Sequence, residues 1–376
     1  MDKRQIKLGV LGFLFVLLTS MLSLKPYLPS ALYHNFPGLK DYTFFSNRVV
    51  QAKAGSAPWL ISDKKLENPP ADLQTLLNDL QTTALLVIED GKIVYEHYDL
   101  GGGAETLSPS FSMSKSILSL LYGFALEDGR IKSLDEPVSR YLPEWEDRDE
   151  GKITLRQLLT MTSGLNWKED FINPFSILAE GYYGRDLHTT ALRQRQVAEP
   201  GKVFSYQSGS VQLLGLALAR ATNMNLSEYL SRKLWFPLGA EKDALWSLDH
   251  EEGMEKAFCC LNATARDFAR IGELTRLKGQ WQGKTLLSDR YINLITTPTH
   301  IADAKDQVKR LFGYDWWIYE SAQGQVPFAW GLLGQYILVV PQKNRVLVRL
   351  GNKSGKILDR FPEEMTKLSE WALSAP

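Results

Sequence analysis

Two pairs of apolar runs, one near each end of the chain, have the pattern of β-hairpins. The runs Thr83–Ile88 and Ile93–Tyr98 are separated by a polar stretch that contains Asp90-Gly91. An Asp-Gly pair supplies the positive φ angles that a tight turn requires. The runs Gly334–Val340 and Arg345–Leu350 are separated by a Pro-Gln-Lys-Asn turn. We therefore expect paired strands at both ends of the chain.

Between these strands the hydrophobic pattern becomes that of helices. The longest runs from about Phe111 to Glu127 and is apolar on nearly every side, which predicts a buried helix, and Gly129 ends it. The order of strands, helices, strands and a last helix predicts a mixed α/β (α+β) fold, in which an antiparallel sheet is built from both chain ends and flanked by helices. A helical insertion is expected over about residues 130–280. Further helices are predicted over residues 154–161, 208–222, 226–234, 264–278 and 362–373.

The N-terminus has a different composition from the rest of the chain. An uncharged apolar run, Leu8–Leu24, follows the basic residues Lys3, Arg4 and Lys7. Residues 1–25 are therefore predicted to be a membrane anchor or a signal segment, with the remainder of the chain exported. No clean cleavage site follows the run, which favours a retained anchor; a cleaved segment would give a secreted protein. Residues 26–75 contain six prolines and are predicted to be an extended connector, followed by one folded domain over 76–376.

Composition excludes several classes of protein. The chain carries 43 basic and 43 acidic residues, so no excess of positive charge points to a nucleic-acid partner. Cys259 and Cys260 are adjacent, and adjacent cysteines rarely pair, so we expect two small buried side chains and no disulfide. No histidine stands near them at ligand spacing, so no metal site is predicted.

Ser112 and Lys115 are the candidate catalytic pair. They stand three residues apart at the start of the predicted buried helix, so both side chains lie on one face. The N–H groups and the dipole of a first helical turn favour negative charge near Ser112. Burial lowers the pKa of a lysine, and a neutral amine can take the proton of a serine hydroxyl. The pair is therefore predicted to be a nucleophile and its base.

The same Ser-x-x-Lys spacing also has a simpler interpretation, a capping serine followed by a solvated lysine. Ser62 and Lys65 share the spacing in a polar stretch, which we attribute to chance. The apolar surroundings of Lys115 favour the catalytic interpretation, because an unpaired lysine would be costly there. The sequence has no G-x-S-x-G or H-E-x-x-H motif, and its five scattered histidines give no support for a Ser-His-Asp triad.

Further sequence blocks follow this pair in a fixed order. They are Leu134-Asp135-Glu136-Pro137-Val138, Tyr141-Leu142-Pro143-Glu144 and Leu158-Leu159-Thr160-Met161-Thr162-Ser163-Gly164-Leu165. Together with Ser112-Met113-Ser114-Lys115 they resemble the serine β-lactamase and penicillin-binding-protein superfamily over roughly residues 75–370. The most similar branch is that of the class C-like esterases and 6-aminohexanoate-dimer hydrolases. The resemblance implies the β-lactamase/DD-peptidase fold, acyl transfer to Ser112, and no metal or organic cofactor.

This branch carries a second element, Tyr-x-Asn or Tyr-x-Ser. The match is the stretch from Tyr206 to Ser208, which is selected by the Pro-Gly before it and the Leu-Leu-Gly after it, because Tyr291 and Tyr319 begin the same short pattern. The resemblance implies that the Tyr206 phenol relays a proton between Ser112 and the leaving group, and that Ser208 lies beside the substrate. The alternative is a tyrosine that only packs.

The third element of the family is altered in this chain. β-Lactamases and transpeptidases carry Lys-Thr-Gly or His-Thr-Gly on a strand, and that cation helps to hold a substrate carboxylate. The matching stretch begins with Ala329, which argues against β-lactam and D-Ala-D-Ala substrates. Gly331 permits close backbone approach, so the N–H groups of Leu332 and Ser112 are expected to form an oxyanion hole. Gly331, Leu332 and Gln335 are predicted to contact the substrate.

Aromatic residues of the helical insertion are further candidates. Tyr182 and Tyr183 are predicted to bind substrate, and Trp167, Phe171 and Phe175 could line the same pocket or belong to the core.

We therefore expect a serine hydrolase that acts on a small-molecule ester or amide, contacts a membrane through its N-terminal segment and binds no nucleic acid. Two alternatives stay open: a non-catalytic exported binding protein with the same fold, and a true β-lactamase or D-Ala-D-Ala carboxypeptidase. Reaction with a fluorophosphonate distinguishes the first, because only an activated serine reacts.

Removing Met1–Lys25 is expected to leave a soluble chain with a reactive Ser112, because every motif lies beyond residue 110. Fluorophosphonate labelling and ester hydrolysis of the full-length and shortened chains would be compared. Loss of reactivity in a correctly folded shortened chain would mean that the segment is more than a tether.

Overall fold

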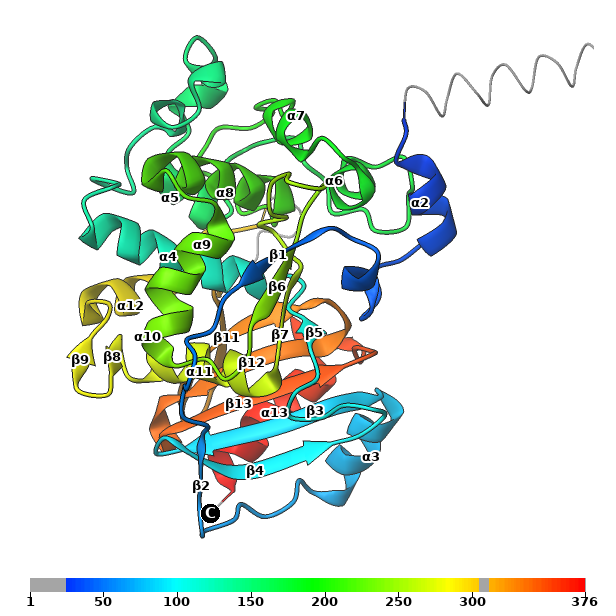
Figure 1. Cartoon of the computed structure of the whole chain (residues 1–376), viewed down its shortest axis with the longest axis vertical. Helices are drawn as coiled ribbons and strands as arrows, with labels where there is room; N and C mark the ends of the chain where they lie inside the picture. Colours follow the sequence, from blue (N-terminus) through cyan, green and yellow to red (C-terminus); the bar gives the residue numbers. More distant parts are fainter. Residues whose placement is uncertain (1–24, 304–310, 376) are drawn as a thin grey trace, which may run out of the picture.

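The computed structural model describes residues 25–303 and 311–375. Its largest sheet has, within these residues, seven strands in the order β10-β11-β12-β13-β3-β4-β2, all antiparallel except the short β2–β4 pair (Figure 1). The two ends of the chain meet at its centre, where Val346 of β13 pairs with Ile88 of β3. This confirms the predicted antiparallel sheet built from both chain ends. The strands are β2 (Leu60–Ile61), β3 (Thr82–Glu89), β4 (Lys92–Tyr98), β10 (Trp317–Ser321), β11 (Gly324–Gly331), β12 (Gln335–Val340) and β13 (Arg345–Gly351).

Each face of this sheet packs on its own hydrophobic core, because side chains alternate along a strand. On β3, Leu85 and Val87 belong to the core shared with α3 (Ala71–Asp79) and α13 (Glu363–Ser374). Leu86 and Ile88 point to the opposite core, which contains α4 (Met113–Glu127) and α11 (Ala265–Arg276). Helices therefore cover both faces of the sheet.

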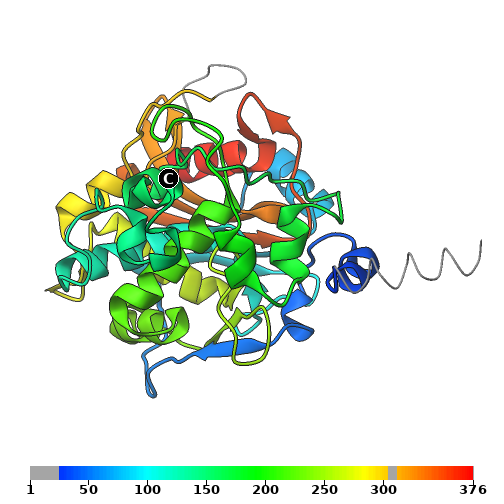
Figure 2. The ribbon, with the colours of Figure 1, turned by 90° about the horizontal axis from the view of Figure 1, so that it is seen from above.

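Helix α4, which begins directly after Ser112, lies between the sheet and a helical region made by the middle of the chain (Figures 1 and 2). Gly123 of α4 permits this close packing, because a Cβ there would lie 2.5 Å from the Tyr291 ring. The other helices are α5 (Leu155–Leu159), α6 (Ile177–Tyr183), α7 (Leu187–Leu192), α8 (Ser208–Thr222), α9 (Leu226–Leu230), the π-turn η5 (Ser231–Trp235), α10 (Phe236–Leu238) and α12 (Asp289–Ile295). Short 3-10 turns are η1 (Asp41–Thr43), η2 (Val138–Arg140), η3 (Pro143–Trp145), η4 (Asp149–Lys152), η6 (Leu332–Gly334) and η7 (Pro341–Lys343).

A second, smaller sheet leads the chain into the start of α4. Its order is β1-β6-β7-β5, and it was not expected from the sequence because strands of two to four residues show no clear alternation. Its strands are β1 (Asn47–Val50), β5 (Ser108–Pro109), β6 (Ala244–Ser247) and β7 (Leu261–Ala263), and two further short hairpins are β8 (Gln280–Trp281) with β9 (Lys284–Thr285) and β14 (Ile357–Leu358) with β15 (Phe361–Pro362).

Residues 26–75 differ from the extended connector predicted for them. They contain α2 (Leu28–His34), strands β1 and β2, and most of α3. Two of the six prolines mark helix starts: Pro29 stands in the first turn of α2, and Pro70 precedes α3. Proline is tolerated there because first-turn N–H groups have no partner within the helix. The apolar run Leu8–Leu24 lies outside the described residues, and none of the helices that are described is long and apolar enough to cross a membrane.

Arg349 is the main polar link inside the structure. Its fully buried guanidinium donates to the carbonyls of Leu333 (3.1 Å) and Gly334 (2.7 Å), which form the turn after β11. It also donates to the carbonyls of Leu80 and Lys353, both at 3.0 Å. One side chain of β13 therefore holds the turn after β11 and the segment before β3 together.

Replacing Arg349 by Met should lower the free energy of unfolding by about 3–5 kcal/mol, because buried carbonyls lose their donor while the packing volume is kept. The free energy of unfolding would be measured by titration with guanidinium chloride, with tryptophan fluorescence as the signal. Arg140→Met is the matched control: that arginine is half exposed and pairs with Glu136, so its loss should cost less than about 1 kcal/mol. Equal effects of the two substitutions would contradict the role of Arg349.

Candidate active site

The chain enters α4 through a strained backbone. Ser110 donates its N–H to the Leu261 carbonyl (2.7 Å), and Phe111 then takes a φ of +41°, which non-glycine residues rarely adopt. Ser112 follows as the N-cap of α4 and is only partly buried. Strain of this kind gathers at functional sites, where the surrounding structure holds it. The turn thus presents the Ser112 hydroxyl at the surface of an otherwise buried helix.

Lys115 lies one turn further along α4 and is 2% exposed. Its Nζ atom lies 2.8 Å from Ser112 Oγ and donates to the Phe258 carbonyl at 2.8 Å. Burial lowers the pKa of this amine to about 8, against the opposing effect of the carboxylates of Glu169 and Asp315. At neutral pH roughly a tenth of the amine is therefore neutral, and it lies directly beside the serine hydroxyl.

Tyr206 closes the other side of this pair. Its ring lies 5.1 Å from Lys115 Nζ and packs on Trp317, and the Ser112 side chain is close enough to its hydroxyl to lower the pKa of the phenol in part. Burial raises the pKa of Tyr206 well above its ordinary value, so the phenol keeps its proton. The other two tyrosines with the same short motif lie elsewhere: the hydroxyl of Tyr291 donates to the Ser119 carbonyl and that of Tyr319 to Glu370.

Gly331 brings the end of β11 against the segment before Ser112. A Cβ at this position would lie 2.2 Å from the Ser110 carbonyl oxygen, so only glycine fits. Leu332 follows, and both Leu332 and Ser112 line the same pocket. Gln335, predicted to contact substrate, is instead fully buried, and its amide bonds the Leu332 carbonyl and the backbone of Gly351. It holds the turn rather than forming the pocket wall.

Two carboxyl groups near Lys115 were not predicted from the sequence. Glu169 accepts hydrogen bonds from the Ser208 N–H (2.5 Å) and hydroxyl (3.0 Å), and burial raises its pKa despite the nearby lysine. Asp315 is buried with neither carboxyl oxygen hydrogen bonded within the described residues, and burial raises its pKa well above its ordinary value. Neither residue belongs to a recognisable motif, and each reaches the site only through the fold.

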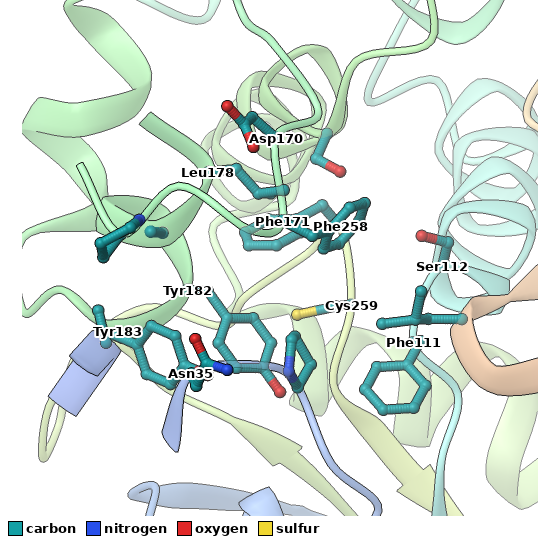
Figure 3. Close-up of a pocket in the computed structure, with 16 residues that line it drawn as sticks. Asn35, Phe111, Ser112, Asp170, Phe171, Leu178, Tyr182, Tyr183, Phe258 and Cys259 are labelled. Atoms are coloured by element: carbon teal, nitrogen blue, oxygen red, sulfur yellow. The ribbon is translucent and has the colours of Figure 1, made fainter. Parts of the chain in front are cut away.

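A narrow pocket opens beside Ser112 and encloses about 550 Å³, including its mouth. Figure 3 shows Ser112 and Phe111 on one side of it and Tyr182 and Tyr183 on the other. Of the other aromatic residues considered from the sequence, Phe171 lines it, Trp167 packs in the core and Phe175 is exposed. The complete lining is Ala31, Asn35, Pro37, Phe111, Ser112, Asp170, Phe171, Pro174, Leu178, Ala179, Tyr182, Tyr183, Ser208, Phe258, Cys259 and Leu332.

The adjacent cysteines correct an expectation from the sequence. Cys259 and Cys260 form a disulfide, where two unpaired side chains were predicted. Cys260 takes a φ of +73°, and this left-handed turn lets two neighbouring side chains face the same side. Cys259 contributes to the pocket wall directly after Phe258, whose carbonyl accepts the Lys115 hydrogen bond.

The wall of this pocket carries no cation. Ala329, which stands where related enzymes have a lysine or histidine, is fully buried in β11, and none of the described lining residues is a lysine or arginine. In the described part of the chain no group of three histidine, cysteine, aspartate or glutamate side chains could hold a metal ion.

A serine and a buried lysine on one helix turn, beside a largely antiparallel sheet with a helical region, define the β-lactamase type of serine hydrolase fold. The Beta-lactamase family model matches residues 72–368, so the chain belongs to this family, as the motif resemblance predicted. It is 25% identical over 298 residues to a 6-aminohexanoate-dimer hydrolase of Paenarthrobacter ureafaciens, covering 75% of each chain.

Among the solved structures that share the fold, two illustrate the similarity. A candidate 6-aminohexanoate-dimer hydrolase from Bacillus anthracis matches 87% of this chain and 89% of its own with a TM-score of 0.74 and 24% identity. EstCE1, described as a hydrolase with promiscuous acyltransferase activity, matches 81% of this chain and 97% of its own with a TM-score of 0.62 and 18% identity.

The rate at which Ser112 reacts with a fluorophosphonate should rise with pH through an apparent pKa near 8, because Lys115 accepts a proton only when neutral. Lys115→Ala should slow the reaction by about 10²-fold or more and remove this pH dependence. Lys202→Ala, at an exposed lysine, is the control and should match the wild type. A pH profile that persists in Lys115→Ala would show that another group is the base.

Proposed function

We propose that this protein is a serine hydrolase that acts by acyl transfer to Ser112 on a neutral ester or a small amide. The observation that carries the proposal is the buried Lys115 amine, 2.8 Å from the Ser112 hydroxyl oxygen and without an ion-pair partner in the part of the chain described. Burying such an amine costs stability, and this cost is expected where the amine serves as a base.

In the acylation step, neutral Lys115 takes the Ser112 proton while Ser112 Oγ attacks the carbonyl carbon of the substrate. Negative charge develops on the carbonyl oxygen, where the N–H groups of Ser112 and Leu332 are proposed to stabilise it. The intermediate then expels the alcohol or amine. The leaving group receives its proton through the Tyr206 hydroxyl, which is replenished from the Lys115 ammonium.

In the deacylation step, water attacks the acyl carbon and gives its proton to Lys115 through the same tyrosine. The carboxylic acid leaves, Ser112 Oγ regains its proton, and the centre returns to its starting state. The closeness of the Tyr206 hydroxyl to Ser112 supports this relay, as does the raised pKa that keeps the phenol protonated.

The wall of the pocket supports a neutral substrate. A carboxylate next to Ser112 would be desolvated without a cation to offset the cost, since Ala329 replaces the positive residue of the family motif. The names of the relatives, a hydrolase of an amide-linked dimer and a hydrolase with acyltransferase activity, agree with ester or amide chemistry. We further propose that Leu8–Leu24 anchors the chain and that the catalytic region is exported.

Wild-type protein should hydrolyse short p-nitrophenyl esters with a kcat/KM at least about tenfold above that for a cephalosporin, because only the cephalosporin brings an uncompensated carboxylate. Ser112→Ala should abolish ester hydrolysis, since it removes the nucleophile. Both substrates would be measured on the same preparation.

Ser114→Ala is the control for this experiment, because Ser114 Oγ donates to the Ala257 carbonyl and does not face Lys115 Nζ. Cephalosporin turnover equal to or above ester turnover would favour a β-lactamase. Failure of the wild type to react with either ester or fluorophosphonate would favour a binding protein that only keeps the fold.

A further inference from the structure

The pocket beside Ser112 has the shape and chemistry of a binding site for an apolar chain. It is narrow, and most of its lining is aliphatic or aromatic, from Phe111 at the nucleophile to Tyr183 at the far side (Figure 3). The Tyr182 hydroxyl is already used by Asp41, at 2.8 Å. A pocket of this kind binds most tightly to a ligand whose methylene groups leave water on binding, because burial of apolar surface supplies the binding free energy.

Two of the segments that line the pocket also expose large apolar side chains. One is α2 with the turn after it, which supplies Ala31, Asn35 and Pro37 to the lining; the other is residues 170–174. The two segments meet where the Phe36 and Phe171 rings lie 6.1 Å apart.

Tyr33 is 85% exposed and Ile172 is 81% exposed. Of the thirteen large apolar side chains that are exposed in the described residues, six belong to these two segments and their immediate continuation: Leu32, Tyr33, Phe36, Phe44, Ile172 and Phe175. Such clustering is unusual on a surface that faces only water. We call these six residues the apolar rim.

The position of the rim in the chain indicates what covers it. The uncharged run Leu8–Leu24, long enough to enter a bilayer, ends four residues before α2 begins at Leu28. A bilayer that holds this run would bring α2, and with it one wall of the pocket, to the membrane surface. Exposed Tyr and Phe side chains suit that interface, because aromatic residues gather at the boundary between lipid and water.

We propose that the substrate of this site is a neutral ester with a long acyl or alkyl chain, which enters the pocket from a lipid bilayer across the apolar rim. The proposal rests on the serine hydrolase function proposed above and adds the substrate class and its source. The chain lies along the pocket from the rim toward Ser112, so that the ester carbonyl reaches the nucleophile with the apolar part already out of water.

Chain length tests the first half of the proposal. For p-nitrophenyl esters from acetate to octanoate, kcat/KM should rise about fourfold for each methylene that enters the pocket. Ala179→Phe, which fills the pocket from α6, should lower the octanoate-to-acetate ratio by about tenfold or more. A flat or falling series in the wild type would overturn the apolar-chain assignment, whereas failure to hydrolyse any ester would instead overturn the serine hydrolase function.

The bilayer source is tested with full-length protein in phosphatidylcholine vesicles that carry p-nitrophenyl palmitate. Leu32→Ser combined with Ile172→Ser should lower the ratio of palmitate turnover in vesicles to acetate turnover in solution by about tenfold, because two large apolar side chains no longer enter the interface. Leu60→Ser is the matched control: Leu60 is similarly exposed, but lies on β2 at the opposite end of the molecule (Figure 1), and its ratio should stay at the wild-type value.

An unchanged ratio in the rim variant would overturn the bilayer assignment. The bilayer assignment would also be overturned if the wild-type protein cleaved soluble octanoate but left the vesicle-borne ester intact. That result would mean that the pocket takes its apolar chains from solution.

Discussion

The burial of one amine underlies the chemistry of this protein. Lys115 lies inside an apolar helix, where its Nζ atom contacts the Ser112 hydroxyl and the Phe258 carbonyl. An ammonium group taken from water without an ion-pair partner is costly, so its pKa falls and the neutral base becomes accessible. The ring of Tyr206 covers the same amine and keeps water from it. The stability of the surrounding core keeps Lys115 buried. In a looser helix, water would reach the amine and its pKa would return toward the ordinary value of a lysine.

The backbone near the nucleophile is held as firmly as the lysine. Phe111 and Leu333 both adopt left-handed conformations, and each is adjacent to a residue whose N–H is proposed to bind the oxyanion. Gly331 allows the two segments to approach, and Arg349 donates to the carbonyls of the second turn. The strain at Leu333 is therefore opposed by a buried network that reaches into the central strands. An oxyanion site needs this rigidity, since its donors must be in position before charge develops.

Different segments of the chain position the reacting groups and form the apolar walls of the pocket. Residues on β5, β11 and α4 position the reacting groups, whereas α2, α6 and residues 170–174 provide the apolar walls. Because α2 directly follows the N-terminal apolar run, the chain that would tether the protein also shapes its substrate pocket. Under the proposed anchor, substrate choice and location would be coupled through one short helix, while the groups around Ser112 stay the same.

The sequence by itself determined the features that depend on near neighbours. The pair Ser112 and Lys115 could be recognised because three residues of helix place both side chains on one face, and both hairpins could be recognised from their turns. Only the tertiary structure brought Glu169 and Asp315 to the lysine, because a carboxylate far along the chain carries no local signal of its contacts. The same holds for the walls built by α2 and for the disulfide between Cys259 and Cys260, where Cys260 has a left-handed backbone conformation. Helical spacing and turn conformation depend on residues that are close together in the sequence, whereas burial and long-range packing depend on the whole fold.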